Sequence, residues 1–179
     1  MQLYHGTNID GLTTLNPNLS NHGKPYVYFT DCFNLAVFYA AKNPIYTYRF
    51  KDGVLHYDEY FDNQFKIFHD GKSGTIYGVD CELQRLEKMP WVYLADTSIG
   101  VKPIKYIDNL YEYLNECVEK GEIILHSFKD ISDKAKEFNF GQIRDEILDC
   151  DLLSKPDDSY AIFIQKYFPQ VWESVAKQQ

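Results

Sequence analysis

Two short segments decide how this chain folds: Leu3-Tyr4-His5-Gly6-Thr7 and, after a polar loop, Tyr26-Val27-Tyr28-Phe29-Thr30. Both are rich in aromatic and β-branched residues and bounded by turn-forming residues, so each predicts a β-strand. In the second segment, Val27 and Phe29 alternate with tyrosines, which places the apolar pair on one face of the strand and Tyr28 on the other. If the apolar face packs in the core, Tyr28 faces a surface on which a ligand can bind.

A helix is expected directly after the second segment. Apolar residues recur at helical spacing from Phe33 to Ala41, and a proline three residues later ends the pattern. Thr30 or Asp31 is expected to cap its N-terminus. Tyr39 lies beside the apolar stripe of this helix, so its ring and that of Tyr28 are expected to share one cleft.

The remaining sequence predicts mostly short strands as far as residue 128 and helices beyond it. Residues 11–24 read as a loop, and residues 83–88 as a helical turn. This order of elements predicts an α+β fold. It also suggests a domain at residues 1–128 and a C-terminal helical extension, residues 129–179, packed on it.

Composition limits the class of partner. The net charge is −8 with a pI near 5.0, and the basic residues are scattered, so nucleic acid is not an expected partner. The four cysteines and five histidines lack metal-ligand spacing, which predicts free thiols, no metal site, and loop or surface positions for the histidines beyond residue 5. No leader and no membrane-spanning run is recognisable, so we expect a cytoplasmic protein with no membrane partner.

The His-Gly-Thr strand, the aromatic second strand and the tyrosine-bearing helix together resemble a known family. They are similar to the ADP-ribosyltransferases of the diphtheria-toxin and poly(ADP-ribose) polymerase type, and particularly to small bacterial rifampin ADP-ribosyltransferases. The likeness covers residues 3–42, is a matter of element order over 75–128, and does not extend to 129–179. It implies a split antiparallel β-sheet core. It also implies NAD as co-substrate and transfer of ADP-ribose to a protein or small-molecule acceptor, with release of nicotinamide, which is a glycosyltransferase reaction.

The resemblance gives five residues a role in binding NAD. His5 corresponds to the histidine that binds a ribose hydroxyl, and Gly6 to the glycine whose backbone holds the nicotinamide carboxamide. Thr7 takes the place of a small hydroxyl residue near the ribose. Tyr28 corresponds to the motif tyrosine of the second strand, and Tyr39 to the helix tyrosine that stacks on nicotinamide.

The family's third catalytic residue has no clear counterpart. It is a Glu or Asp at the start of a late strand, but no acid precedes the strand expected at 103–107. The nearest upstream carboxylate is Asp96, which completes a predicted catalytic set with His5 and Tyr28; a plain turn residue is the alternative for Asp96. Ala36 stands where some relatives have a serine that bonds the carboxamide.

Two other functions compete with the transferase. The first is a catalytically impaired member of the same fold, which binds NAD or ADP-ribose or serves as a protein-interaction module. The second is NAD-dependent removal of a 2′-phosphate from RNA, which requires the clustered basic residues that this sequence lacks.

Overall fold

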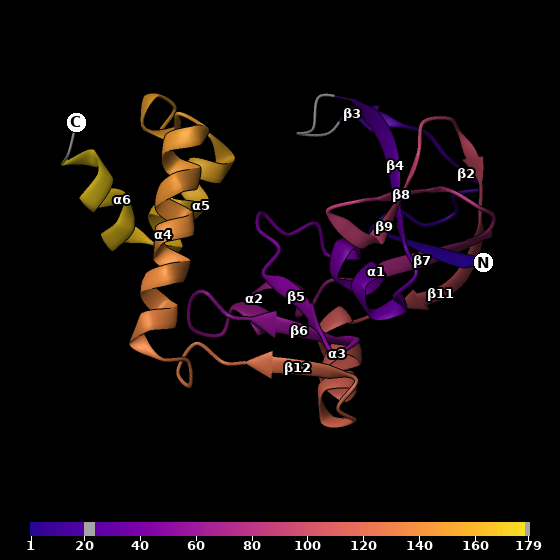
Figure 1. The fold of residues 1–179 in the computed structure, drawn as a ribbon, viewed down its shortest axis with the longest axis horizontal. Helices are drawn as coiled ribbons and strands as arrows, with labels where there is room; N and C mark the ends of the chain where they lie inside the picture. Colours follow the sequence, from indigo (N-terminus) through magenta and orange to yellow (C-terminus); the bar gives the residue numbers. More distant parts are fainter. Residues whose placement is uncertain (20–23, 178–179) are drawn as a thin grey trace. The chain divides into compact units, whose positions relative to one another are not determined.

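The computed structural model describes residues 1–19 and 24–177, which form a mixed α+β fold with antiparallel sheets, as predicted (Figure 1). Residues 20–23, within the expected loop, lie outside the described part. The chain divides into two compact units, Met1–Asn43 with Lys66–Ile123 and Pro44–Phe65 with Ile124–Gln179. Segment 44–65 therefore groups with the C-terminal helices, whereas its place in the sequence predicts membership of domain 1–128.

The described part of the first unit is built on a seven-stranded sheet of order β11-β7-β1-β4-β9-β8, with β3 joined to β4. The two segments that decide the fold form β1 and β4, which are antiparallel neighbours near its centre. The edge strand β11 carries a register shift between Pro103 and Lys105. The strands are β1 Gln2–Thr7, β3 Asn18–Leu19, β4 Pro25–Thr30, β7 Gly74–Asp80, β8 Gln84–Leu86, β9 Met89–Ala95 and β11 Lys102–Ile107.

One face of this sheet carries an apolar core cluster. Leu3, Val27 and Phe29 are each at most 3% exposed and belong to it, which confirms the alternation predicted for β4. Leu15 joins the same cluster from a two-stranded sheet. That sheet pairs β2 (Thr14–Leu15) with β10 (Ile99–Gly100), so the expected loop 11–24 in fact contains the short strands β2 and β3.

Helix α1 (Phe33–Ala40) packs on the opposite face of β1. The rings of Tyr4 and Phe33 meet edge to face with centroids 5.2 Å apart. Gly6 lies so close to the helix that a Cβ atom on it would be 1.7 Å from the carbonyl oxygen of Ala36. Because Tyr4 is the register partner of Thr30, the residues of β4 that share its face, Tyr28 included, leave the sheet on the side of α1.

The N-terminus of α1 is not capped as predicted. Cys32 occupies the N-cap position, and its side chain accepts no capping hydrogen bond. The Thr30 Oγ1 instead accepts a hydrogen bond from the Cys32 N–H at 3.1 Å. The Asp31 carboxylate accepts one from the Tyr93 hydroxyl, also at 3.1 Å. Both predicted caps thus accept hydrogen bonds from groups outside the helix, Thr30 from the N-cap residue and Asp31 from Tyr93.

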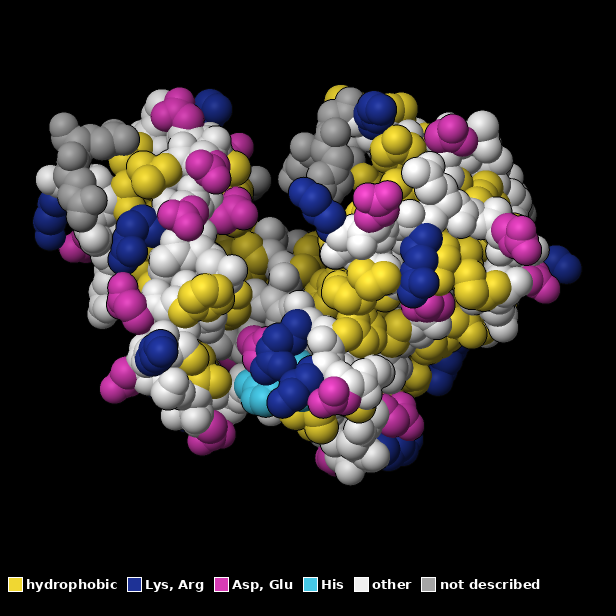
Figure 2. Space-filling model, viewed as in Figure 1, with side chains coloured by type: hydrophobic (Ala, Val, Ile, Leu, Met, Phe, Trp, Pro, Cys, Tyr) yellow, Lys and Arg dark blue, Asp and Glu magenta, His cyan; other side chains and the backbone are white. Residues whose placement is uncertain are grey.

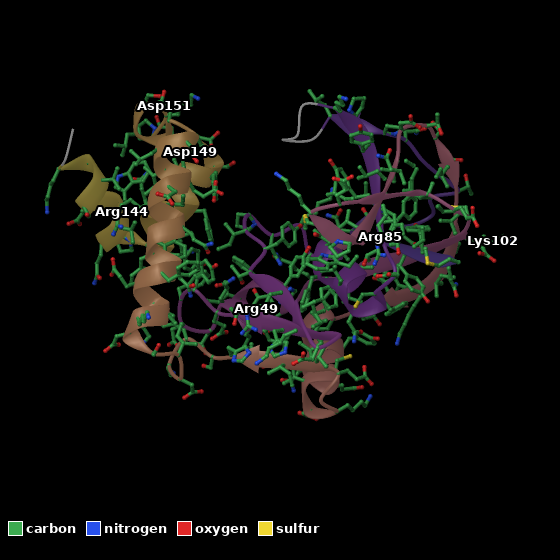
Figure 3. All side chains as sticks on the ribbon, viewed as in Figure 1. Arg49, Arg85, Lys102, Arg144, Asp149 and Asp151 are labelled. Atoms are coloured by element: carbon green, nitrogen blue, oxygen red, sulfur yellow. The ribbon has the colours of Figure 1, made fainter. Side chains whose placement is uncertain are left out.

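Residues 84–86 form a strand, and the helical turn predicted for 83–88 is wrong. The strand β8 pairs with β9, and Arg85 is the register partner of Tyr93. The guanidinium of Arg85, which Figure 3 labels, lies 5.8 Å from the centroid of the Tyr93 ring. Cross-strand pairing of this kind overrides weak local preferences.

The N-terminus of helix α3 (Leu110–Glu119) in the first unit is capped by Asn109, whose side chain accepts hydrogen bonds from the N–H groups of Tyr111 and Glu112. Helix α2 spans Gln64–His69. No helix in residues 1–19 and 24–177 is both long and apolar enough to cross a bilayer.

The second unit combines a small sheet with the C-terminal helices. The sheet has the order β12-β6-β5, and the β5–β6 hairpin turns at Asp52 and Gly53, which both have positive φ as a two-residue turn requires. Gly141 does not interrupt α4. The elements are β5 Tyr48–Lys51, β6 Val54–Asp58, β12 Ile123–His126, α4 Asp133–Asp149, the 3-10 turn η1 Leu152–Ser154, α5 Ser159–Tyr167 and α6 Pro169–Ala176.

We expect Gly6→Ala to destabilise the fold strongly, because its methyl group would meet the backbone of Ala36, which cannot move without shifting α1. Overpacking of this kind lowers the free energy of unfolding by about 3 kcal/mol. Denaturant unfolding followed by circular dichroism measures it. Gly141→Ala is the matched control: apart from the neighbouring backbone of α4 itself, no described atom lies within 4 Å of its added Cβ, so this change should stabilise α4 by about 0.5–1 kcal/mol. Equal effects of the two substitutions would contradict the packing argument.

Candidate functional site

Tyr28 and Tyr39 lie on the same side of the main sheet. Tyr28 is half-buried on the face of β4 that is turned toward α1, and its ring meets that of Tyr26 edge to face at 6.3 Å. Tyr39 is half-buried on α1, whereas both of its neighbours, Phe38 and Ala40, are at most 1% exposed. The fold thus brings together the two elements that carry these rings; that the rings line one cleft stays a prediction.

His5 is held by a hydrogen bond to the neighbouring strand. Its Nδ1 lies 2.8 Å from the carbonyl oxygen of Tyr28. A carbonyl oxygen can only accept, so Nδ1 carries the proton and Nε2 presents a lone pair when the ring is neutral. The ring leaves β1 on the face of the core cluster, 5.8 Å from the Phe29 ring. His5 and Tyr28 therefore meet through imidazole and carbonyl, and their rings project from opposite faces of the sheet.

The ladder between β1 and β4 is short at this point. β1 pairs with β7 along its whole length, from Gln2 to Thr7. Among the described residues, its pairing with β4 is confined to Tyr4 and Thr30. If the β1–β4 ladder continued, Gly6 would pair with Tyr28. Instead, the His5 imidazole donates a hydrogen bond to the Tyr28 carbonyl oxygen. The main chain of β1 is thus unpaired with β4 at Gly6.

Burial lowers the pKa of His5 below its ordinary value of 6.5. The hydrogen bond to the Tyr28 carbonyl acts in the opposite direction, and the nearby Lys42 ammonium lowers the pKa further. The imidazole is therefore neutral at pH 7. Sequence reasoning did not place Lys42 near His5. The signal in the sequence was its position directly after the predicted helix; in the structure Lys42 adopts a left-handed conformation with φ 49°.

Gly6 and Thr7 also have structural roles. Gly6 permits the close approach of α1 described above. Thr7 is 6% exposed, and its Oγ1 accepts a hydrogen bond from the Ile9 N–H at 3.3 Å. The Thr7 hydroxyl thus stabilises the turn that follows β1. A role for either residue in binding a ribose or carboxamide remains a prediction.

The structure does not bring Asp96 to His5. Asp96 is exposed and follows Ala95, the last residue of β9, which pairs with Val27 on the side of β4 away from β1. Two strand spacings, about 10 Å across the sheet, therefore separate the strands that carry Asp96 and His5. Asp96 makes no hydrogen bond or ion pair with the described residues. Chain order alone could not reveal that β4 lies between them.

The other described histidines do not all occupy the expected surface positions. His69 is fully buried, with its Nε2 3.3 Å from the Asn43 side-chain nitrogen. In the second unit, the His56 Nδ1 lies 2.9 Å from the His126 Nε2. Burial, then Arg49 and His126, lower the pKa of His56. Figure 2 shows a face of the molecule on which histidine side chains adjoin those of Lys and Arg. Within the described residues, no group of three or more His, Cys, Asp or Glu side chains could hold a metal ion.

Comparisons of the chain with models of protein families, with curated proteins and with solved structures gave no match. Any assignment of function therefore depends on the residues of this chain and on their geometry. The features that bear on it are the bonded histidine, the two tyrosines on the α1 side, and the stretch of β1 at Gly6 that does not pair with β4.

We expect Lys42→Asn to raise the pKa of His5, because the substitution removes a positive charge that disfavours the imidazolium. Asn tolerates the left-handed backbone at this position. Burial is the larger cause of the depression, so the pKa should rise yet stay below 6.5. An NMR titration of the His5 ring protons measures it. A pKa that is unchanged or lower in the variant would contradict the assigned proximity.

Proposed function

We propose that this chain binds NAD and transfers its ADP-ribose to a protein or small-molecule acceptor with release of nicotinamide. The observation that carries the proposal is the interruption of the β1–β4 ladder at Gly6 and Tyr28. Main-chain polar groups that leave a ladder need another partner. A nicotinamide carboxamide has both a donor and an acceptor to offer Gly6 there.

The tyrosines suit the ring of the same ligand. The nicotinamide of NAD is a cationic pyridinium, and the face of a tyrosine attracts a cation by ~1–2 kcal/mol when water is excluded. Tyr28 and Tyr39 are both half-buried on the α1 side of the sheet, so each has a partly exposed surface. A flat cation that bound on that side of the sheet would meet aromatic rings.

The electrostatics of His5 and Lys42 suit the rest of NAD. A neutral His5 with its proton on Nδ1 can accept a hydrogen bond at Nε2 from a ribose hydroxyl without adding charge. The pyrophosphate of NAD is anionic, and a chain with net charge −8 needs a local cation to hold it. Lys42 supplies a positive charge near His5.

The proposed reaction breaks the bond between C1′ of the ribose and the nicotinamide nitrogen. The bonding electrons leave with nicotinamide, which becomes neutral, and an acceptor nucleophile then bonds C1′ and gives up its proton. The sugar passes through an oxocarbenium-like state, which a nearby carboxylate stabilises.

The chain's four cysteines are free, which agrees with action in the reducing cytoplasm.

A second candidate is a module of the same kind that binds NAD or ADP-ribose without chemistry. The separation of Asp96 from His5 by the width of β4 favours the binding module. A carboxylate at that distance stabilises a positive charge at C1′ only weakly. Ala36 favours it too, since its side chain offers no hydroxyl for the carboxamide.

We expect His5→Ala and Tyr28→Ala each to reduce NAD turnover by at least tenfold, since each removes a contact to the ribose or to the pyridinium. Release of nicotinamide from labelled NAD, measured in the presence of a host lysate, reports turnover and labels the acceptor. Tyr106→Ala is the matched control, because Tyr106 is 53% exposed on the edge strand β11. Equal turnover in the wild type and both site variants would dismiss the assignment.

The Asp96→Asn variant separates the two candidates. Asp96 makes no bond within the described residues, so this variant should fold and bind NAD as the wild type does. If Asp96 serves the chemistry, nicotinamide release falls at least tenfold while the Kd for NAD, from calorimetry, changes less than twofold. NAD binding without nicotinamide release in the wild type itself identifies the binding module.

A further inference from the structure

We propose that the second unit carries a ligand site of its own, a cavity between the β5–β6 hairpin and helix α4 that takes a neutral planar heterocycle with an amide-like edge. The cavity has a volume of about 490 Å³, within the range of small-molecule sites. All of its lining residues belong to the second unit. The site is therefore separate from the one built around His5.

One face of α4 forms a wall of the cavity. Ala135, Phe138, Asn139 and Gln142 all line it, and their spacing of three, one and three residues places them on a single stripe of the helix. An ordinary packed stripe at these positions would be apolar. This one carries two carboxamides, which the apolar core of the unit does not need.

Asn139 is the residue that points to a ligand. It is only 7% exposed, yet its carboxamide makes no hydrogen bond with any residue that the structure describes. Every fully buried side-chain N or O among the described residues has a hydrogen-bond partner. The amide atoms of Asn139 have none, so they keep some accessible surface. The remaining accessible surface of Asn139 lines the cavity. A nearly buried amide without an internal partner is costly unless a bound molecule or water satisfies it.

The other walls favour a flat ring. Tyr46, Tyr48 and Tyr60 line the cavity from the hairpin side, and Phe138 lines it from α4. Phe138 is 66% exposed and Tyr46 is 40% exposed, so apolar surface remains uncovered beside the polar amide. The Tyr60 hydroxyl donates a hydrogen bond to the Gln142 Oε1, which joins the two walls. Aromatic walls around one directional amide suit a planar ligand.

The charges that line the cavity cancel. Arg49, on the hairpin (Figure 3), donates two hydrogen bonds to the Asp58 carboxylate, at 2.9 Å from Nε and 3.0 Å from its terminal nitrogen. A bidentate pair of this kind satisfies both partners. No net charge is left in the cavity to select an ion, so the ligand is neutral.

The chemistry of Asn139 specifies the edge of the ligand. A carboxamide presents one acceptor and one donor side by side, and it pairs with a ring that offers an adjacent donor and acceptor. The N6 and N7 atoms of adenine form such an edge, as does the imide edge of uracil. The ligand class is therefore a heterocycle of nucleobase size, free or as part of a larger neutral molecule.

Calorimetry with adenine and with uracil tests the proposal on the full chain. We expect saturable binding of at least one base. Asn139→Leu, similar in size but without the amide, should weaken that binding at least fivefold. Indole, a planar ring without the acceptor, should bind the wild type and Asn139→Leu alike. Because Asn139 lies in the second unit, a loss of base affinity in Asn139→Leu places the bound base in this cavity and not beside His5.

Two results would overturn the proposal: no saturable binding of either base at millimolar concentration, or a loss smaller than fivefold in Asn139→Leu. Circular dichroism establishes that the variant is folded. If Asn139→Leu does not fold, Asn139→Asp replaces it. That variant keeps the shape but exchanges the donor for a charged acceptor, so the same fivefold loss is expected of it and a smaller loss overturns the proposal.

Discussion

The backbone of β1 approaches the backbone of α1 at Gly6 more closely than any side chain would allow. This contact sets the distance between the central strand of the main sheet and the helix that carries Tyr39. With the helix held there, Tyr28 leaves β4 on the side of the helix and Phe29 enters the core on the other. The bond from His5 to the Tyr28 carbonyl then joins the two central strands where their ladder stops. A single glycine thus positions most of the candidate site.

Local patterns predicted the parts of the fold that depend on local physics. The alternation of Val27 and Phe29 with tyrosines gave the two faces of β4, and the apolar spacing after it gave helix α1. Spatial neighbours could not be predicted in this way. The strand β8 exists because β9 pairs with it, and the grouping of segment 44–65 with the C-terminal helices follows from contacts distant in sequence.

The same division applies to the candidate site. His5, Gly6 and Tyr28 were proposed from a motif, because they lie in two segments that are close in the sequence and that form neighbouring strands of the sheet. The position of Asp96 depended on the strand order, which places β4 between β9 and β1. Lys42 and Asn139 carry no motif at all. Their significance comes from electrostatic proximity to His5 in one case and from burial without a partner in the other.

The edge strand β11 bears on how copies of the chain behave at high concentration. Ile104 and Tyr106 are 46% and 53% exposed there, an apolar surface that invites a strand from another molecule. Pro103 has no N–H to give to such a strand, and the bulge that follows it bends the hydrogen-bonding groups out of line. Lys102 and Lys105 add like charges that repel an identical edge. These features protect the edge strand β11 against polymerisation by strand pairing, which its exposed apolar side chains would otherwise favour.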